Sequence, residues 1–353
     1  MSSKKLKKTA AIDDASLNLL IVLLAACILI VAVTAAYFIV TKTANSGRVE
    51  HSGDGSGNSD VPAGVTGNYP FKEDISLNIS NDTANAEGIT GIDASNAVLI
   101  DVTTGEIIAA KGSGVEMHPA SMTKVMTLIV VAENLKSEAS LNDKLAITQE
   151  HINFKIQNKL SGELKAGEYT VNDLIHHMIL KSDGVAAIVL SEYIAGSQAN
   201  FVKLMNDKAQ ELNLEKTSFQ NVDGSHEKYH LSTCRDIAKI MAYAMQNNFC
   251  ASILSCQKYQ PVLCYHSLLV SLLHNDQPSL KEEMKNVNIL AGKTGWTDSI
   301  SKGESGGCLV TYAKGNNGHF YVAVVAGTSG SSYPVAMTNA VSDLKIIFKT
   351  YAE

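Results

Sequence analysis

The sequence predicts an α+β fold, with an antiparallel β-sheet lobe flanked by helices and a second lobe that is all α. Two observations support this prediction. Strand-like segments occur near residues 96–111 and again between residues 288 and 327, whereas residues 170–244 follow helical spacing almost throughout. Strands at both ends of a folded region are expected to form one sheet, and the helical block between them a separate lobe.

Length, composition and charge limit the classes of protein to consider. The chain has 353 residues, of which 45% are hydrophobic, enough for one large or two-lobed core plus appendages. Its formal net charge is −6, and it has no basic patch or stripe of the kind that binds nucleic acid. We therefore expect no nucleic-acid partner.

The N-terminal part of the chain resembles a membrane anchor. Residues 19–40 carry no charge and would span about 33 Å as a helix, enough to cross a bilayer. Lysines in the preceding tail, residues 1–18, predict a cytoplasmic N-terminus. A secretory signal cleaved near residues 33–35 is the alternative, although the apolar run is longer than a typical signal core. Either way the rest of the chain is exported, and we expect a single-pass protein of the cell membrane.

The region after the anchor has the composition of a linker. Residues 41–87 are rich in Ser, Gly, Asn and Asp and show no sustained apolar period, which predicts a flexible extracytoplasmic tether. Residues 88–353 are predicted to form one domain. It begins with a β-hairpin, residues 96–101 and 106–111 around a Thr-Thr-Gly turn.

The middle of the domain carries helix start and stop signals. Residues 141–150 and 162–169 look like short strands or loops of the second lobe. A capping-box pattern at Thr170 then begins a helix, which Asp183-Gly184 interrupts and which resumes up to Gly196. Two further amphipathic helices are predicted at the following positions: residues 199–212 and 232–244.

The C-terminal part returns to strands. Residues 288–296, 308–313 and 319–327 are strand candidates, and the last two are joined by a Lys-Gly-Asn-Asn-Gly turn. Apolar residues at spacings of three and four predict a closing helix over residues 335–351.

Ser121 and Lys124 form the first motif that carries chemistry. Three positions apart on a helix, they lie on one face, and a lysine of lowered proton affinity can take the proton of a serine hydroxyl. Pro119 and the apolar run after residue 125 place Ser121 at a helix N-terminus, which favours developing negative charge. Alone, the pattern is weak evidence for catalysis, because in many soluble helices a capping serine and a solvated lysine have this spacing by chance.

A second motif, Lys293-Thr294-Gly295 followed by Trp296, changes that assessment. Ser-x-x-Lys followed much later by Lys-Thr-Gly on a strand is the signature of penicillin-recognising serine acyl-enzymes. From about Ile89 to its end, the chain resembles the serine-type D-alanyl-D-alanine carboxypeptidases, which are low-molecular-mass penicillin-binding proteins. The resemblance implies a β-lactamase/transpeptidase-like fold with the active site between two lobes.

The family's third motif, Ser-x-Asn, has its best match in Ser182-Asp183-Gly184, where glycine stands in place of asparagine. A side-chain amide there would position the catalytic lysine and donate a hydrogen bond to the substrate backbone, and glycine can do neither. The resemblance therefore implies a slower enzyme, which Gly184→Asn would accelerate. In the alternative interpretation, Ser182 is a helix residue beside a glycine kink.

The resemblance also implies roles for these residues. Ser121 attacks the carbonyl of the penultimate D-alanine of a peptidoglycan stem peptide, Lys124 accepts its proton, and Ser182 relays the proton to the leaving D-alanine. Backbone N–H groups of Ser121 and Trp296 form an oxyanion hole. β-Lactams acylate the same serine.

The second motif supplies charge and substrate contacts in this scheme. Lys293 helps to keep Lys124 neutral, Thr294 binds the terminal carboxylate, and Gly295 lets the substrate backbone approach the strand. The chemistry requires no metal or other cofactor.

Other interpretations stay open at this point. A β-lactamase shares the two lysines and the nucleophile, although the glutamate motif of the class that deacylates through it is missing. A catalytically weakened penicillin- or peptidoglycan-binding protein would follow from Gly184, and an endopeptidase would act on cross-links by the same chemistry. A metal site at Cys250, Cys256, Cys264 and His266 is not favoured, because their spacing matches no common zinc pattern.

Overall fold

The computed structural model describes residues 77–84, 86–256, 258–260, 264–265, 284–297 and 306–352. All of them belong to one of the two units into which the chain divides, residues Val61–Glu353. The predicted tail and anchor, residues 1–40, lie outside the described part. Within that part no single helix is long and apolar enough to cross a membrane, and only a pair bent by 86° meets the test of length and composition.

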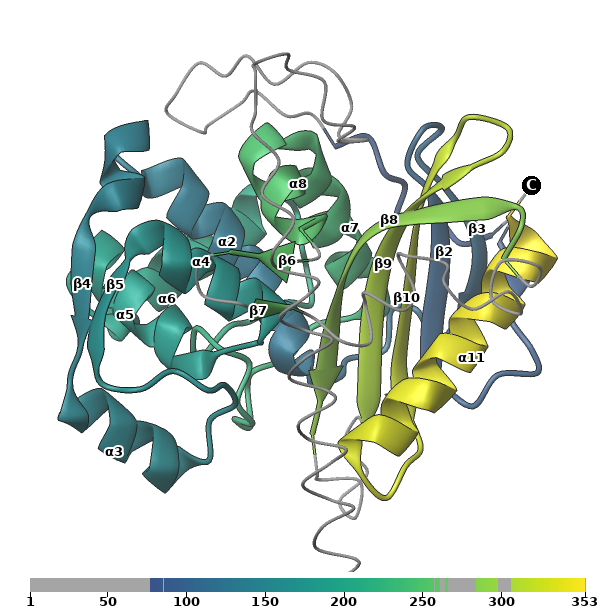
Figure 1. The fold of residues 1–353 in the computed structure, drawn as a ribbon. Helices are drawn as coiled ribbons and strands as arrows, with labels where there is room; N and C mark the ends of the chain where they lie inside the picture. Colours follow the sequence, from purple (N-terminus) through teal and green to yellow (C-terminus); the bar gives the residue numbers. More distant parts are fainter. Residues whose placement is uncertain are drawn as a thin grey trace, which may run out of the picture. The chain divides into compact units, whose positions relative to one another are not determined.

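A six-stranded sheet forms one lobe, with the strand order β1-β3-β2-β10-β9-β8 (Figure 1). Its strands are β1 (Glu87–Gly88), β2 (Asn96–Asp101), β3 (Glu106–Lys111), β8 (Val287–Trp296), β9 (Gly307–Gly315) and β10 (Phe320–Thr328). Neighbouring strands are antiparallel except β1, which runs parallel to β3. The predicted hairpin and the three predicted C-terminal strands are confirmed. Most of their residues are buried, because helices cover both faces of the sheet.

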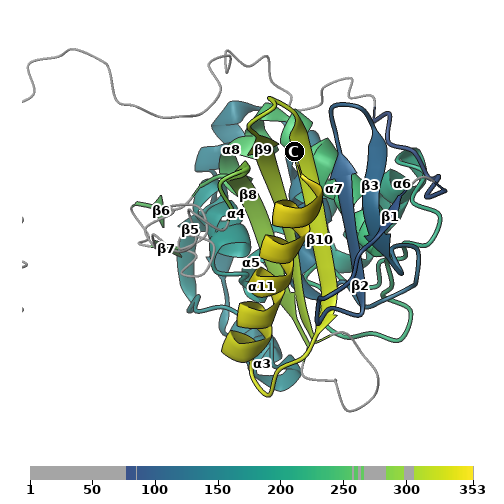
Figure 2. The ribbon, with the colours of Figure 1, turned by 90° about the vertical axis from the view of Figure 1, so that its right-hand side faces the viewer.

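Both faces of the sheet are covered by helices. Helix α11 (Tyr333–Tyr351) lies across one face, as Figure 2 shows, and α7 (Cys234–Gln246) covers the other. The period of two is visible in β2, where Leu99 belongs to the core under α11 and Val98 and Ile100 belong to the larger core shared with the helical lobe. The order of strands therefore places β8, with its Lys-Thr-Gly motif, at the sheet edge.

Helix α2 is central to the second lobe and contacts most of the other helices there. The helices of this lobe are α2 (Thr123–Asn134), α3 (Gln149–Asn158), α4 (Val171–Leu180), α5 (Gly184–Ala195), α6 (Gln198–Glu211) and α8 (Asn248–Leu254). The predicted capping box at Thr170 is confirmed, because its side chain accepts a hydrogen bond from the first turn of α4, and the predicted end at Gly196, with φ 74°, is confirmed for α5. Asp183, predicted only as part of a helix interruption, is the N-cap of α5.

The prediction of an all-α second lobe is wrong in one respect. Two short antiparallel ribbons lie outside the main sheet, β4 (Lys144–Ile147) with β5 (Gly167–Thr170) and β6 (Lys258–Tyr259) with β7 (Cys264–Tyr265). The ribbon β4–β5 falls almost entirely in the two segments, residues 141–150 and 162–169, that the sequence predicts as short strands or loops of this lobe, whereas β6–β7, with two residues per strand, was not predicted. The fold is therefore mixed α and β in both lobes.

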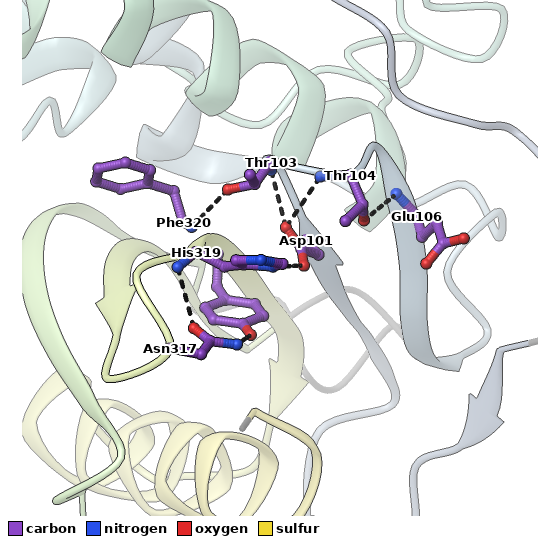
Figure 3. A network of polar contacts seen from close by, with 8 residues as sticks. Asp101, Thr103, Thr104, Glu106, Asn317, His319 and Phe320 are labelled. Carbon is purple, nitrogen blue, oxygen red and sulfur yellow. Dashed lines mark hydrogen bonds and ion pairs between the residues drawn. The ribbon is translucent and has the colours of Figure 1, made fainter.

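The β2–β3 turn is joined to the β9–β10 turn by a polar network (Figure 3). The Asp101 carboxylate accepts hydrogen bonds from the backbone N–H groups of Thr103 (2.8 Å) and Thr104 (3.2 Å), and its other oxygen lies 2.6 Å from Nδ1 of His319. The N–H of Phe320 donates to the Thr103 hydroxyl at 2.9 Å. These contacts fix the end of the sheet.

The end of the predicted linker contacts the domain. The N–H of Ser80 donates to the carbonyl of Gly105 at 2.9 Å. Asn81 accepts hydrogen bonds from the side chains of Arg235 (2.8 Å) and Lys239 (2.6 Å) on α7. Leu77 and Ile79 pack against the larger core, so residues 77–81 of the predicted linker already belong to the folded part.

Candidate active site

Ser121 lies in a 3-10 turn, η1 (Ala120–Met122), that leads directly into α2. Ala120 has φ 47°, a left-handed conformation that non-glycine residues rarely adopt and that is common at functional sites. Two glycines make room for this turn. A Cβ at Gly224 (φ +85°) would lie 2.0 Å from the Ala120 carbonyl oxygen, and one at Gly295 would lie 3.2 Å from the Ser121 nitrogen. The turn is therefore held between residues 221–225 and β8.

Lys124 lies one turn beyond Ser121 and is fully buried. Its Nζ donates hydrogen bonds to Oγ of Ser121 at 3.0 Å and to the carbonyl of Asp223 at 2.6 Å. Burial lowers the pKa of Lys124, and the negative charges of Asp223 and Asp183 oppose that shift. The predicted serine–lysine pair is thus in hydrogen-bond contact, with an amine that loses its proton more readily than an exposed lysine.

Lys293 forms a second lysine–serine pair. Its Nζ, on β8, donates to Oγ of Ser182 at 3.0 Å and to the carbonyl of Thr294 at 2.9 Å. Burial, and then the charge of Lys124, hold the pKa of Lys293 well below its usual value. Ser182 joins α4 to α5 at φ 55°, also left-handed, and its carbonyl accepts a hydrogen bond from the Ser161 hydroxyl at 2.5 Å.

The two pairs meet at one cleft of ≈ 390 Å³. Its lining includes five of the residues that the motifs predict: Ser121, Ser182, Thr294, Gly295 and Trp296. Lys124 and Lys293 lie buried behind it, each bonded to one of the two serines. The structure therefore brings every predicted site residue together, although these residues come from three segments far apart in the sequence.

A second hollow, of ≈ 410 Å³, lies between residues 77–79 and the β2–β3 turn. No lysine, histidine or carboxylate lines it, so it offers no group that could activate a nucleophile. The cleft at Ser121 is the candidate active site.

Tyr333 lines the cleft and was not predicted. It opens α11, its hydroxyl donates to Oγ1 of Thr294 at 3.4 Å, and its ring meets Trp296 edge-on with centroids 6.3 Å apart. On the opposite lobe, Lys181 and Glu163 line the cleft and form an ion pair of 3.4 Å. A tyrosine after a Ser/Gly-rich turn carries no sequence signal of such a position.

His230 supports the nucleophile segment from beneath. Its Nδ1 accepts the N–H of Gln220 at 3.1 Å, which places its proton on Nε2, 2.8 Å from the Thr123 hydroxyl. The ring is 1% exposed, and burial lowers the pKa of His230 to about 3. A permanently neutral histidine thus fixes the residue that stands between Ser121 and Lys124.

Asp183, in the third motif, is occupied as a helix cap. Its carboxylate accepts the backbone N–H groups of Val185 (2.9 Å), Ala186 (3.1 Å) and Leu164 (3.0 Å). With these bonds in place, Asp183 does not turn toward Lys124 to replace the missing asparagine.

The space beside Gly184 is already filled. A Cβ added there would lie 3.1 Å from Cβ of Leu160 and 3.3 Å from Oδ2 of Asp223. Gly184 is the first residue of α5, so the obstacle to a larger side chain is crowding rather than a left-handed backbone. The expectation that Gly184→Asn would by itself accelerate the reaction has to be corrected for this crowding.

None of the cysteines whose side chains the structure describes lines the cleft. Cys234, Cys250 and Cys308 are buried in the larger core, where burial raises the pKa of the Cys234 thiol. The side chains of Cys264 and His266 lie outside the described residues. Within the described part of the chain no three potential metal-ligating side chains come together.

A profile of the D-alanyl-D-alanine carboxypeptidase family, peptidase S11, matches residues 81–330. The chain belongs to this family. The resemblance stated from the motifs is therefore confirmed.

Individual members of the family match over part of their length. The D-alanyl-D-alanine carboxypeptidase DacF of Bacillus subtilis is 33% identical over 241 residues, which cover 67% of this chain and 58% of DacF. The chain thus spans less than two thirds of that relative.

Solved structures share the fold of this carboxypeptidase-family chain. Penicillin binding protein 5 from Haemophilus influenzae superimposes with a TM-score of 0.60 and 25% identity, over 73% of this chain and 70% of its own. The Streptomyces K15 DD-transpeptidase gives a TM-score of 0.60 and 22% identity over 73% of this chain and 98% of its own.

Proposed function

We propose that this protein is a serine-type D-Ala-D-Ala carboxypeptidase that removes the terminal D-alanine from peptidoglycan stem peptides and that penicillin acylates. Its family membership supports the proposal, and one observation carries it. The Nζ of the buried Lys124 donates a hydrogen bond of 3.0 Å to the hydroxyl of Ser121 in a cleft that β8 borders.

Acylation begins at Ser121. Its Oγ attacks the carbonyl carbon of the penultimate D-alanine while its proton passes to the amine of Lys124, whose pKa is lowered by burial. The tetrahedral oxyanion accepts hydrogen bonds from the backbone N–H groups of Ser121 and Trp296. Each such donor contributes about 3–4 kcal/mol of transition-state stabilisation.

The leaving group needs a proton. Ser182, which is hydrogen-bonded to Lys293, relays the proton from Lys124 to the departing nitrogen, the C–N bond breaks and D-alanine leaves. Water then attacks the ester and regenerates the Ser121 hydroxyl. Thr294 holds the substrate carboxylate, with the Tyr333 hydroxyl beside it.

Location follows from the substrate. Peptidoglycan lies outside the cytoplasmic membrane, and the apolar residues 19–40 would anchor the chain with its N-terminus inside and its folded domain outside. This part of the proposal rests on the sequence.

The test is release of D-alanine from a peptide that ends in D-Ala-D-Ala, measured with the full chain. Ser121→Ala should abolish release, whereas Ser252→Ala, on the remote helix α8, should leave it unchanged. A fluorescent penicillin should label the protein and stay attached over the time of the assay. Rapid hydrolysis of penicillin without D-alanine release would indicate a β-lactamase instead, and labelling without turnover of either compound would indicate a binding protein.

A further inference from the structure

The turn formed by residues 221–225 packs on the first turns of the nucleophile helix. Asn221 closes it, because its Oδ1 accepts the N–H of Gly224 and its Nδ2 donates to the carbonyl of Ser225, both at 2.8 Å. The hydroxyl of Thr127, on α2, donates to the carbonyl of Val222 at 2.7 Å. The position of this turn relative to α2 is therefore fixed by hydrogen bonds on both sides.

Asp223, within this turn, contacts both the lysine and the place of the missing amide. It is 6% exposed. Its carbonyl accepts the 2.6 Å hydrogen bond from Lys124, and its carboxylate accepts the Ser225 hydroxyl at 2.5 Å. The same carboxylate oxygen lies 3.3 Å from the position of a Cβ on Gly184, where the asparagine side chain of the family motif would begin.

Lys124 is surrounded by few charged groups. From the cap of α5 it faces Asp183, whose carboxylate is bonded to backbone N–H groups. From β8 it faces the side chain of Lys293, whose pKa is held well below its usual value by burial, and on another side it faces His230, whose pKa burial lowers to about 3. Asp223 is the carboxylate on the remaining side, and it is the strongest of the negative charges acting on the lysine.

We propose that Asp223 is a positioning residue that takes over one task of the amide missing at Gly184, that of positioning the catalytic lysine. Its carboxylate fills the space beside Gly184 and stabilises the ammonium that forms on Lys124 when the Ser121 proton moves to it. The inference rests on the proposed acyl-enzyme function.

The test is the pH dependence of acylation by a fluorescent penicillin in Asp223→Asn, which keeps the shape and the contact with Ser225. Removing the negative charge lets burial lower the pKa of Lys124 further, so the acid limb of the rate profile should move to lower pH. The maximal rate should fall on the order of 10-fold, as for one unit of pKa. Asp207→Asn, which removes an exposed carboxylate of α6, should change neither.

A double variant tests the replacement itself. Gly184→Asn alone should slow acylation because the new side chain meets Leu160 and Asp223. Asp223→Ala opens that space, so Gly184→Asn combined with Asp223→Ala should react faster than either single variant. If the rate factors of the two single variants simply multiply in the double variant, the inference is overturned. A carboxylate that stands in for the missing amide requires the two positions to interact.

The outcomes separate the two levels of the proposal. A wild-type chain that penicillin does not acylate overturns the proposed function and this inference together. A wild-type chain that is acylated, with an Asp223→Asn variant whose acid limb stays in place, overturns only the role of Asp223. An Asp223→Asn variant that is acylated more slowly while its acid limb stays in place also overturns the role of Asp223, because a purely structural change would produce that result.

Discussion

Residues with buried polar groups support the catalytic segment, and His230 is the clearest example. It is 1% exposed, and burial lowers its pKa to about 3, whereas a histidine of the unfolded chain titrates near 6.5. Between these two values the unfolded chain binds a proton that the folded chain does not. Stability is therefore complete above the unfolded value and falls as the pH drops toward the folded one.

The expected loss is about 1.4 kcal/mol of unfolding free energy per pH unit from this group, or about 2 kcal/mol between pH 6.5 and about pH 5. Urea unfolding of the wild type and of His230→Gln at several pH values measures it. The variant should lose less stability on acidification than the wild type. If the unfolding free energy of the two proteins fell equally with pH, the low pKa assigned to His230 would be contradicted.

The hydroxyl of Tyr333 is expected to contribute to substrate binding. Its hydroxyl donates to Thr294, the proposed carboxylate ligand, so Tyr333→Phe removes one neutral hydrogen bond. We expect KM for a D-Ala-D-Ala peptide to rise about 2- to 10-fold with kcat little changed. Tyr351→Phe, at the other end of α11, is the matched control. A fall in kcat at constant KM would place Tyr333 in the chemical step instead.

Sequence spacing identified the residues that belong to motifs, and missed those that act through contacts. Ser121 with Lys124, and Lys293 with Thr294, are local patterns that can be recognised without a fold. Asp223, His230 and Tyr333 reach the site from segments that only the folded chain brings together. The Asn-x-Asp-Gly pattern at residues 221–224 does indicate a turn, but nothing in it indicates where that turn packs.

At the scale of elements, a buried ion pair joins α2 to α6. Nζ of Lys208 lies 2.7 Å from Oε2 of Glu133, with both side chains nearly inaccessible, and the Tyr243 hydroxyl of α7 donates to the same carboxylate at 2.5 Å. Lys208→Met would leave the Glu133 carboxylate buried without its ion-pair partner.

The expected cost of Lys208→Met is about 3–5 kcal/mol of unfolding free energy, measured by urea unfolding. Lys203→Met, an exposed lysine of the same helix, should change stability by less than about 0.5 kcal/mol. Equal stabilities of the two variants would show that the ion pair contributes little.

Elements with a buried apolar face could be predicted, and elements without one could not. Helix α4 combines an apolar period with a capping box, whereas helix α5 and strands β2 and β10 are nearly continuous apolar runs bounded by recognisable caps and turns. Helix α3 has no buried residue, so it shows no apolar period, and a capping box between Thr148 and His151 supports its start instead. The segments of β4 and β5 were predicted as short strands or loops, but the pairing of β4 with β5 could not be, and β6–β7, with two residues per strand, was not predicted.

For the whole molecule, the position relative to the membrane is the main prediction from sequence. Because residues 19–40 are apolar and follow a lysine-rich tail, the full chain should sediment with membranes. Protease added outside protoplasts should digest the folded domain. A domain that survives external protease and is cut only after lysis would contradict the predicted orientation.

Ser121 is the proposed nucleophile, and peptide mass spectrometry after penicillin labelling tests this assignment most directly. The full chain is labelled, digested, and searched for the peptide whose mass has increased by one penicillin. We expect the adduct on the peptide that contains Ser121, and no adduct in a folded Ser121→Ala variant. An adduct on the peptide that contains Ser182, or labelling that persists in Ser121→Ala, would contradict the account.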